Sequence, residues 1–174
     1  SNYIRELNLN SVKNLINQID PSISIKNVSI SNYLNYRVQL IYNSNNLKVY
    51  NDSKCTNLNN AVYKNNYINS NKKILILGGK FKKQDKNLKF NIQNTLVLIF
   101  GYQSNLFINQ LNFINSNYFK FNNLIELINF LKIIVKLRKY KYILFSPGGE
   151  SLDFYKNYSD RGKHFNQLIK KALF

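Results

Sequence analysis

The 174-residue sequence has one cysteine, one histidine and two prolines, and it has no methionine or tryptophan. The lone Cys55 excludes an internal disulfide and a cysteine zinc cluster, and the lone His164 excludes a site with several histidine ligands. No apolar run reaches the roughly 18 residues of a membrane span. There is no signal-peptide pattern, and the chain begins with Ser1 instead of Met, so we expect a piece of a longer, non-membrane protein.

Acidic residues are also scarce, with 8 Asp+Glu against 25 Lys+Arg and a formal net charge of +17. A polyanionic partner such as nucleic acid would explain this charge. An AT-rich genome would explain it equally, because Asn, Lys, Ile, Tyr and Phe have AT-rich codons and are heavily used here. The lysines are scattered and never form a run longer than two, which favours the genomic explanation over a nucleic-acid-binding arm.

Hydrophobic residues make up 44% of the chain, enough for a folded core. Residues 37–42 and 47–50 alternate like the strands of a hairpin. Strand and helix patterns then alternate along the chain, with strands predicted at 73–79, 95–100, 118–121 and 141–145, and helices at 58–67, 103–111, 122–138 and 152–173. This order predicts an α/β fold, with a Rossmann-like, mostly parallel sheet flanked by helices and an N-terminal β-hairpin.

Four predicted loops follow strands, at 51–57, 78–85, 101–103 and 146–151. The carboxyl ends of parallel strands share one edge of a sheet, so we expect these loops to converge on one ligand. The last loop contains a Gly-Gly pair and runs into a helix that we expect to begin near Leu152. A helix N-terminus favours an anion, and we expect Ser151 to cap this helix or to offer its hydroxyl to the ligand.

The loop Asn-Asp-Ser-Lys-Cys-Thr-Asn at 51–57 closely resembles the Asp-Ser-Lys-Ala-Thr-Asn signature of the D-glutamate-adding members of the Mur ligase family. Leu77-Gly-Gly79 with Lys82 and Asp85 resembles the family's next motif. The segment from Ser146-Pro147 to Phe165 resembles its third.

A fourth match lies earlier in the chain, where Arg37 stands at the arginine of the family's His-Arg motif and Tyr36 replaces the histidine. The resemblance covers residues 34–174 as a C-terminal domain. It makes residues 1–33, which have a helical pattern at 9–19, the tail of a central ATPase domain.

The resemblance implies an ATP-dependent amide ligase of cytoplasmic peptidoglycan synthesis. In this reaction ATP phosphorylates the carboxylate of UDP-N-acetylmuramoyl-L-alanine, and the amine of D-glutamate attacks the acyl phosphate. The implied Mg²⁺ ligands lie in the central domain and none lies in this chain. The partners would be the enzyme's own N-terminal and central domains. The sequence contains no Gly-x-x-Gly-Lys-[Ser/Thr] phosphate loop, so we expect the chain alone to be inactive.

The resemblance also implies roles for individual residues. It assigns nucleotide binding to Arg37 and Asp52, the latter through the ribose hydroxyls, and catalysis to Lys54, which would face the phosphates and the reacting carboxyl groups. It assigns D-glutamate binding to a third group, in which Lys82 pairs with a carboxylate and Tyr158 acts through its backbone: Thr56, Lys82, Ser151 and Tyr158.

Structural alternatives stand beside these roles. Asp52 could cap the turn before the 58–67 helix, and Ser151 could be only a helix cap. Arg37 could pair with a structural carboxylate, and Lys54 and Lys82 could be two of many solvated lysines. We expect Asp153 and Arg161 to be structural, as a helix-start charge and an intrahelical partner.

Glu150 departs from the family pattern, because the corresponding loop is usually small and uncharged. It could face solvent, pair with a lysine, or point inward and weaken D-glutamate binding. Two other functions stay open: a basic nucleic-acid-binding α/β module, and an inactive remnant of the ligase. Retention of Asp52, Lys54 and Lys82 argues against a remnant.

Overall fold

A computed structural model describes residues 35–173 except 45, 83–88 and 138–139. The helical pattern predicted at 9–19, the proposed tail at 1–33 and Asp85 lie outside the described residues. No helix in the described part is both long and apolar enough to cross a membrane.

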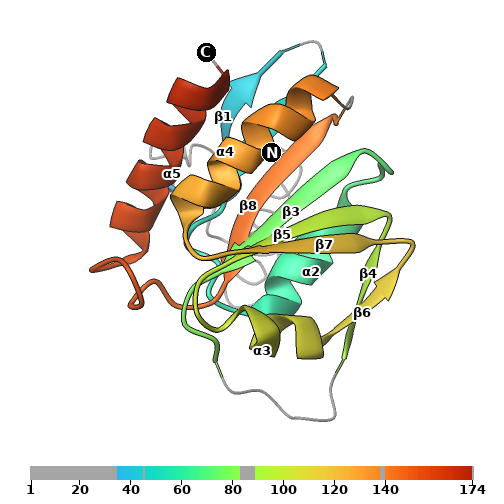
Figure 1. The fold of residues 1–174 in the computed structure, drawn as a ribbon, viewed down its shortest axis with the longest axis vertical. Coiled ribbons are helices and arrows are strands. Elements are labelled where there is room, and N and C mark those ends of the chain that lie inside the picture. The colour runs from blue at the N-terminus through green and yellow to red at the C-terminus, as the bar shows by residue number, and fades with distance from the viewer. Residues whose placement is uncertain (1–34, 45, 83–88, 138–139, 174) are drawn as a thin grey trace, which may run out of the picture. The chain divides into compact units, whose positions relative to one another are not determined.

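A six-stranded sheet forms the centre of the fold, in the order β1-β2-β8-β3-β5-β7 (Figure 1). All neighbouring pairs are parallel except the β1–β2 hairpin, so the predicted fold class is confirmed. The strands are β1 (Gln39–Asn43), β2 (Lys48–Asn51), β3 (Lys73–Gly78), β5 (Thr95–Phe100), β7 (Asn117–Phe121) and β8 (Tyr142–Gly148).

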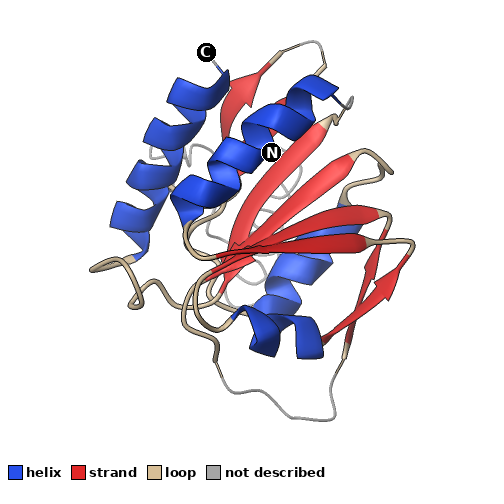
Figure 2. Ribbon diagram, viewed as in Figure 1, coloured by secondary structure: helices blue, strands red, loops and turns tan. Residues whose placement is uncertain are grey.

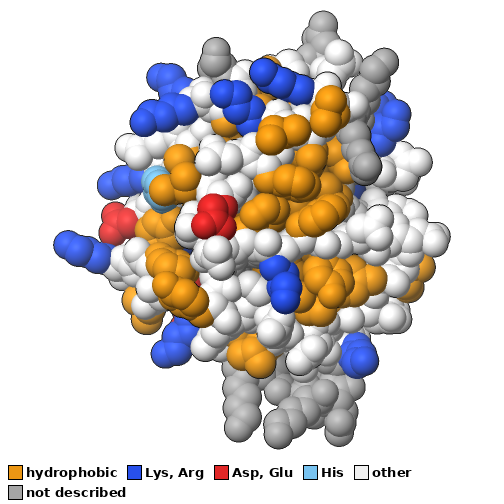
Figure 3. Space-filling model, viewed as in Figure 1, with side chains coloured by type: hydrophobic (Ala, Val, Ile, Leu, Met, Phe, Trp, Pro, Cys, Tyr) orange, Lys and Arg blue, Asp and Glu red, His pale blue; other side chains and the backbone are white. Residues whose placement is uncertain are grey.

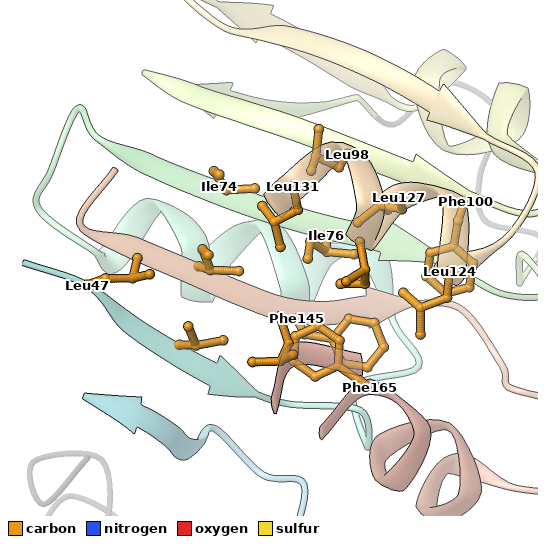
Figure 4. Packing of buried hydrophobic residues seen from close by; sticks show 14 residues of the cluster. Leu47, Ile74, Ile76, Leu98, Phe100, Leu124, Leu127, Leu131, Phe145 and Phe165 are labelled. Atoms are coloured by element: carbon orange, nitrogen blue, oxygen red, sulfur yellow. The ribbon is translucent and has the colours of Figure 1, made fainter. Parts of the chain in front are cut away.

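Helices cover both faces of this sheet (Figure 2). The helices α4 (Leu124–Leu137) and α5 (Tyr158–Leu173) pack on one face, and α2 (Leu58–Tyr67) and α3 (Ser104–Asn109) pack on the other. Because both faces are covered, the inner strands are continuous apolar runs, and every residue of β3 is buried. Alternate β3 side chains enter the two cores: Ile74 and Ile76 meet α4 (Figure 4), and Leu75 and Leu77 meet α2.

The predicted bounds of α2 and β5 match the structure, whereas α5 begins later than predicted. It starts at Tyr158 and not near Leu152, and β8 continues to Gly148. Asn157 sets the start of α5, since its Oδ1 accepts from the Asp160 N–H at 2.9 Å. Residues 151–157 form turns, so Ser151 does not cap α5 and no helix N-terminus follows it directly.

A second, two-stranded sheet was not predicted. Its parallel strands are β4 (Phe90–Gln93) and β6 (Leu111–Ile114), and β6 begins where the sequence predicted the end of a helix. Each strand has four residues with polar Asn or Gln among them, so neither shows the apolar run of a buried strand.

Candidate functional site

The loops after β2, β3, β5 and β8 meet at the carboxyl edge of the sheet, as predicted. Gly148 N–H donates to the Cys55 carbonyl at 3.0 Å, which joins the first loop to the last. The backbones of Lys80 and Glu150 exchange two hydrogen bonds, of 2.7 and 2.8 Å. A Cβ on Gly101 would lie 3.3 Å from Asp153 Oδ2, so the loop after β5 joins the same cluster.

The glycines at this edge allow the loops to touch. A Cβ on Gly149 would lie 2.8 Å from the Gly78 carbonyl oxygen and 2.9 Å from that of Lys80. Only a residue without a side chain permits this approach of two backbones.

Asp52 is buried in this cluster, with 1% of its surface exposed. Its Oδ2 accepts from Lys64 Nζ and from Ser146 Oγ, both at 2.7 Å. Its Oδ1 accepts from the Val38 N–H at 3.2 Å. The cap of α2 is Asn57, so the capping alternative for Asp52 is wrong. Its carboxylate instead joins β8, α2 and the segment before β1.

Lys54 and Tyr158 are brought together, with Lys54 Nζ 5.0 Å from the centre of the Tyr158 ring. A cation in this position is attracted by the negative face of the ring. The Tyr158 carbonyl accepts from Ser53 Oγ at 2.8 Å, which fixes the start of α5 against the 51–57 loop. Thr56 is half-buried in that loop, and Ser151 is buried in the loop after β8.

Arg37 is exposed, but the backbone on both sides of it is bound to the 51–57 loop. Lys54 N–H donates to the Tyr36 carbonyl at 3.1 Å, and Val38 N–H donates to Asp52. Tyr36 and Val38 both have positive φ, of 63° and 47°. A β-branched residue with a positive φ is strained. The two backbone hydrogen bonds hold Tyr36 and Val38 in this conformation, and they thereby fix the backbone of Arg37 between them.

Lys82 forms an ion pair with Glu150, with Nζ 3.2 Å from Oε1. Of the three possibilities for Glu150, the structure therefore shows pairing with a lysine. Lys82 is the same lysine that the resemblance assigns to a D-glutamate carboxylate.

The buried residue that organises the site is Arg161, whose contacts the sequence did not predict. Its side chain is fully buried. Nε and Nη2 donate to Ser53, at 3.1 Å to Oγ and 2.7 Å to the carbonyl, and Nη1 donates to the Gly149 carbonyl at 3.0 Å. It is structural, as expected, but it joins loops and is not an intrahelical partner. Burial lowers its pKa to about 10, so it stays cationic at neutral pH.

Asn51 provides a second buried link between the same elements. Its Nδ2 donates to the Gly162 carbonyl at 2.9 Å and to Asn166 Oδ1 at 2.7 Å. Its Oδ1 accepts from Ser53 N–H at 3.0 Å. The sequence signal for such a link is a polar residue in a motif loop together with a Gly and an Asn one turn apart on a later helix.

A cavity of about 320 Å³ opens between the loop after β5 and the start of α4. Gly101 lines it, and none of the predicted site residues does. Among the described residues, no three His, Cys, Asp or Glu side chains are placed to hold a metal ion.

The Lys and Arg side chains on the face shown in Figure 3 are spread around it and do not gather into one patch. An apolar area over the sheet and its helices separates several of them. This distribution gives the nucleic-acid alternative no support from that face.

The parallel sheet and its converging loops define an α/β domain with a polar, cation-bearing site at its carboxyl edge. No family model matches the chain. It is 35% identical over 156 residues to the UDP-N-acetylmuramoylalanine–D-glutamate ligase of Prochlorococcus marinus (strain MIT 9312), covering 83% of this chain and 32% of that protein. The ligase of the same name from Petrotoga mobilis is 34% identical over 142 residues, covering 80% and 32%.

A third ligase of that name, from Buchnera aphidicola subsp. Baizongia pistaciae, is 31% identical over 179 residues, covering 99% of this chain and 38% of the relative. The chain thus spans about a third of the length of these relatives. It belongs to the Mur ligase family, and it matches the C-terminal part of the D-glutamate ligases of peptidoglycan biosynthesis.

Proposed function

We propose that this chain is the D-glutamate- and ATP-contacting part of the cytoplasmic ligase that adds D-glutamate to UDP-N-acetylmuramoyl-L-alanine. The observation that supports this proposal best is the position of the 51–57 loop. Its Lys54 lies against Tyr158 of α5, and the buried Ser151 lies in the loop after β8, which is hydrogen-bonded to the 51–57 loop through Gly148 and Cys55. Residues more than ninety positions apart in the sequence, which the resemblance assigns to one reaction, thus occupy one edge of the sheet.

The reaction must hold several anions close together. ATP, when bound, would supply the phosphoryl group that makes a carboxylate into an electrophile. The chain's own part is to place cations and donors: Lys54 near the phosphates and the acyl group, and Lys82 near a carboxylate of D-glutamate. Positioned charges of this kind favour a transition state in which negative charge is redistributed.

The second carboxylate of D-glutamate would take hydroxyl and backbone donors. Thr56 and Ser151 would supply hydroxyls from two loops that are joined by the Gly148–Cys55 hydrogen bond. Tyr158 would act through its backbone, at the point where Ser53 already fixes the start of α5. Bound in this way, the amine of D-glutamate could face the acyl phosphate.

Asp52 as a ribose ligand is restricted by its own contacts. A carboxylate has about four acceptor positions, and three on Asp52 are taken by Lys64, Ser146 and Val38. We propose that the fourth accepts from a ribose hydroxyl. The central domain would supply the Mg²⁺ ligands and the phosphate loop, so we propose that the chain alone does not turn over.

Titration of the full 174-residue chain with D-glutamate, followed by amide NMR, tests this function. We expect shifts concentrated at Thr56, Ser151 and Tyr158, with L-glutamate giving smaller shifts at equal concentration. Ser151→Ala should weaken binding, and Ser159→Ala, eight positions later, serves as the control. Shifts confined to other surfaces, or none up to tens of millimolar, would contradict the proposal.

A further inference from the structure

The ion pair between Lys82 and Glu150 engages the lysine that the proposed function assigns to the substrate. Lys82 Nζ lies 3.2 Å from Glu150 Oε1, and the two side chains are 50% and 32% exposed. In the described part of the chain the only other ion pair joins Lys64 to Asp52. Lys82 is therefore not a free cation in this structure, because a carboxylate of the same chain already neutralises it.

The backbone of Glu150 is fixed. Its N–H donates to the Lys80 carbonyl at 2.8 Å, and its carbonyl accepts from Lys80 N–H at 2.7 Å. The Gly149 carbonyl before it is held by buried Arg161, and Ser151 after it is buried. Only the side chain of Glu150 is left to move, so its carboxylate is presented from a rigid point paired with Lys80, two residues before Lys82, and next to Ser151.

We propose that the Glu150 carboxylate occupies the position of a substrate carboxylate at Lys82 and is a competitor within the chain. This inference rests on the proposed function. A dicarboxylic amino acid must exchange with Glu150, one carboxylate replacing another on Lys82 without proton transfer. The exposed pair is a weak one, so it reduces affinity without closing the site.

D-Glutamate carries two carboxylates, on its α-carbon and on its side chain, and D-glutamine carries only the first. Comparison of the two ligands therefore identifies the carboxylate that exchanges with Glu150. In either case the gain from pairing with Lys82 is reduced, since the substrate carboxylate replaces an existing pair.

The test compares the dissociation constants of D-glutamate and D-glutamine, measured by NMR titration of the full chain. The variants are wild type, Glu150→Gln and Glu126→Gln. The last removes the same charge from the exposed start of α4 and controls for the overall change in net charge. We expect Glu150→Gln to bind D-glutamate about two- to fivefold more tightly. D-glutamine should gain equally where its α-carboxylate exchanges with Glu150 and should not change where the side-chain carboxylate does, and Glu126→Gln should match wild type for both.

The possible results separate the two proposals. Equal D-glutamate affinity in wild type and Glu150→Gln, or weaker binding in Glu150→Gln, would overturn the inference and leave the proposed function standing. A gain for D-glutamate alone would support the inference with the side-chain carboxylate at Lys82, and equal gains for both ligands would support it with the α-carboxylate there. Absence of D-glutamate binding in all three chains would overturn the proposed function, and the inference with it.

Discussion

Arg161 contacts Ser53 at two points, donating from Nε to the hydroxyl at 3.1 Å and from Nη2 to the backbone carbonyl at 2.7 Å. These residues lie 108 positions apart, one in the C-terminal helix and one in the loop after β2. Both are fully buried. The guanidinium thus supplies the hydrogen bonds that allow two loops to lie inside the protein with their carbonyls satisfied.

Replacing Arg161 should therefore destabilise the whole domain. Arg161→Met leaves the carbonyls of Ser53 and Gly149 buried without donors. We expect the free energy of unfolding to fall by about 2–4 kcal/mol, since each unsatisfied buried group costs about 1–3 kcal/mol. Urea denaturation measures the effect. Lys163→Met, an exposed change on the same helix, is the control, and equal stability of the two variants would contradict this role.

Lys64 should stabilise the buried carboxylate of Asp52. Its ammonium bonds Oδ2 at 2.7 Å, with the two side chains 30% and 2% exposed. We expect Lys64→Met to reduce the free energy of unfolding by about 1 kcal/mol, because solvent screens the exposed partner and Ser146 still donates to the same oxygen. Lys72→Met, at an exposed position, should have no measurable effect in the same denaturation experiment. An unchanged free energy of unfolding in Lys64→Met would contradict this role. It would show that the hydrogen bonds from Ser146 and Val38 are enough to stabilise the buried carboxylate.

Gly149 should tolerate no side chain. A Cβ there would meet the Phe107 ring at 2.9 Å as well as two backbone oxygens. Backbone atoms cannot move aside cheaply, so we expect Gly149→Ala to cost about 1–3 kcal/mol, as overpacking does elsewhere, and to separate the loops after β3 and β8. Thermal unfolding should show a lower midpoint for Gly149→Ala than for Leu152→Ala, which changes an exposed side chain three residues later. Similar midpoints would mean that the loops adjust freely.

His164 should make stability depend on pH. Its Nδ1 lies 2.9 Å from the Tyr155 hydroxyl, and burial lowers its pKa below the ordinary 6.5. The folded chain therefore binds a proton less readily than the unfolded chain does. This contribution to stability is fully present above about pH 6.5 and is lost as pH falls through the lowered folded value. Urea unfolding at several pH values between 8 and 4.5 measures it.

The matched variant for this prediction is His164→Asn, which can keep a partner for Tyr155 without titrating. We expect the free energy of unfolding of wild type to fall more than that of His164→Asn as the solution is acidified. Parallel pH profiles would exclude His164 as the source. The half-buried Asp153 acts in the opposite direction, because burial raises its pKa and the folded chain then binds a proton more readily than the unfolded chain does.

The sequence predicted best the elements that depend on their own local pattern. The apolar run of β5 and the cap and periodicity of α2 fix their bounds without help from distant residues. The start of α5 was misplaced because Leu152 and Phe154 look like an apolar helix face, whereas the Asn157 cap decides where the helix begins.

The site was predictable in its position and less so in its contacts. Strand ends in a parallel sheet share an edge, so convergence of the loops followed from fold class alone. The pairing of Glu150 with Lys82 did not follow from fold class, because it depends on the distance between two loops almost seventy residues apart in the sequence. For the same reason the sequence could not show that Arg161 would reach Ser53, and the ligand-binding roles of the seven site residues stay predictions.

The place of β8 in the strand order has a consequence for synthesis on the ribosome. β8 lies between β2 and β3 and pairs with both, yet it is the last strand to be made. Until β8 emerges, the β1–β2 hairpin has no backbone hydrogen bonds to the group of paired strands β3, β5 and β7. Arg161 follows later still. The apolar strands of a nascent chain must therefore avoid mispairing until nearly all of these residues have been translated. A chain whose translation is interrupted before β8 should be prone to aggregation.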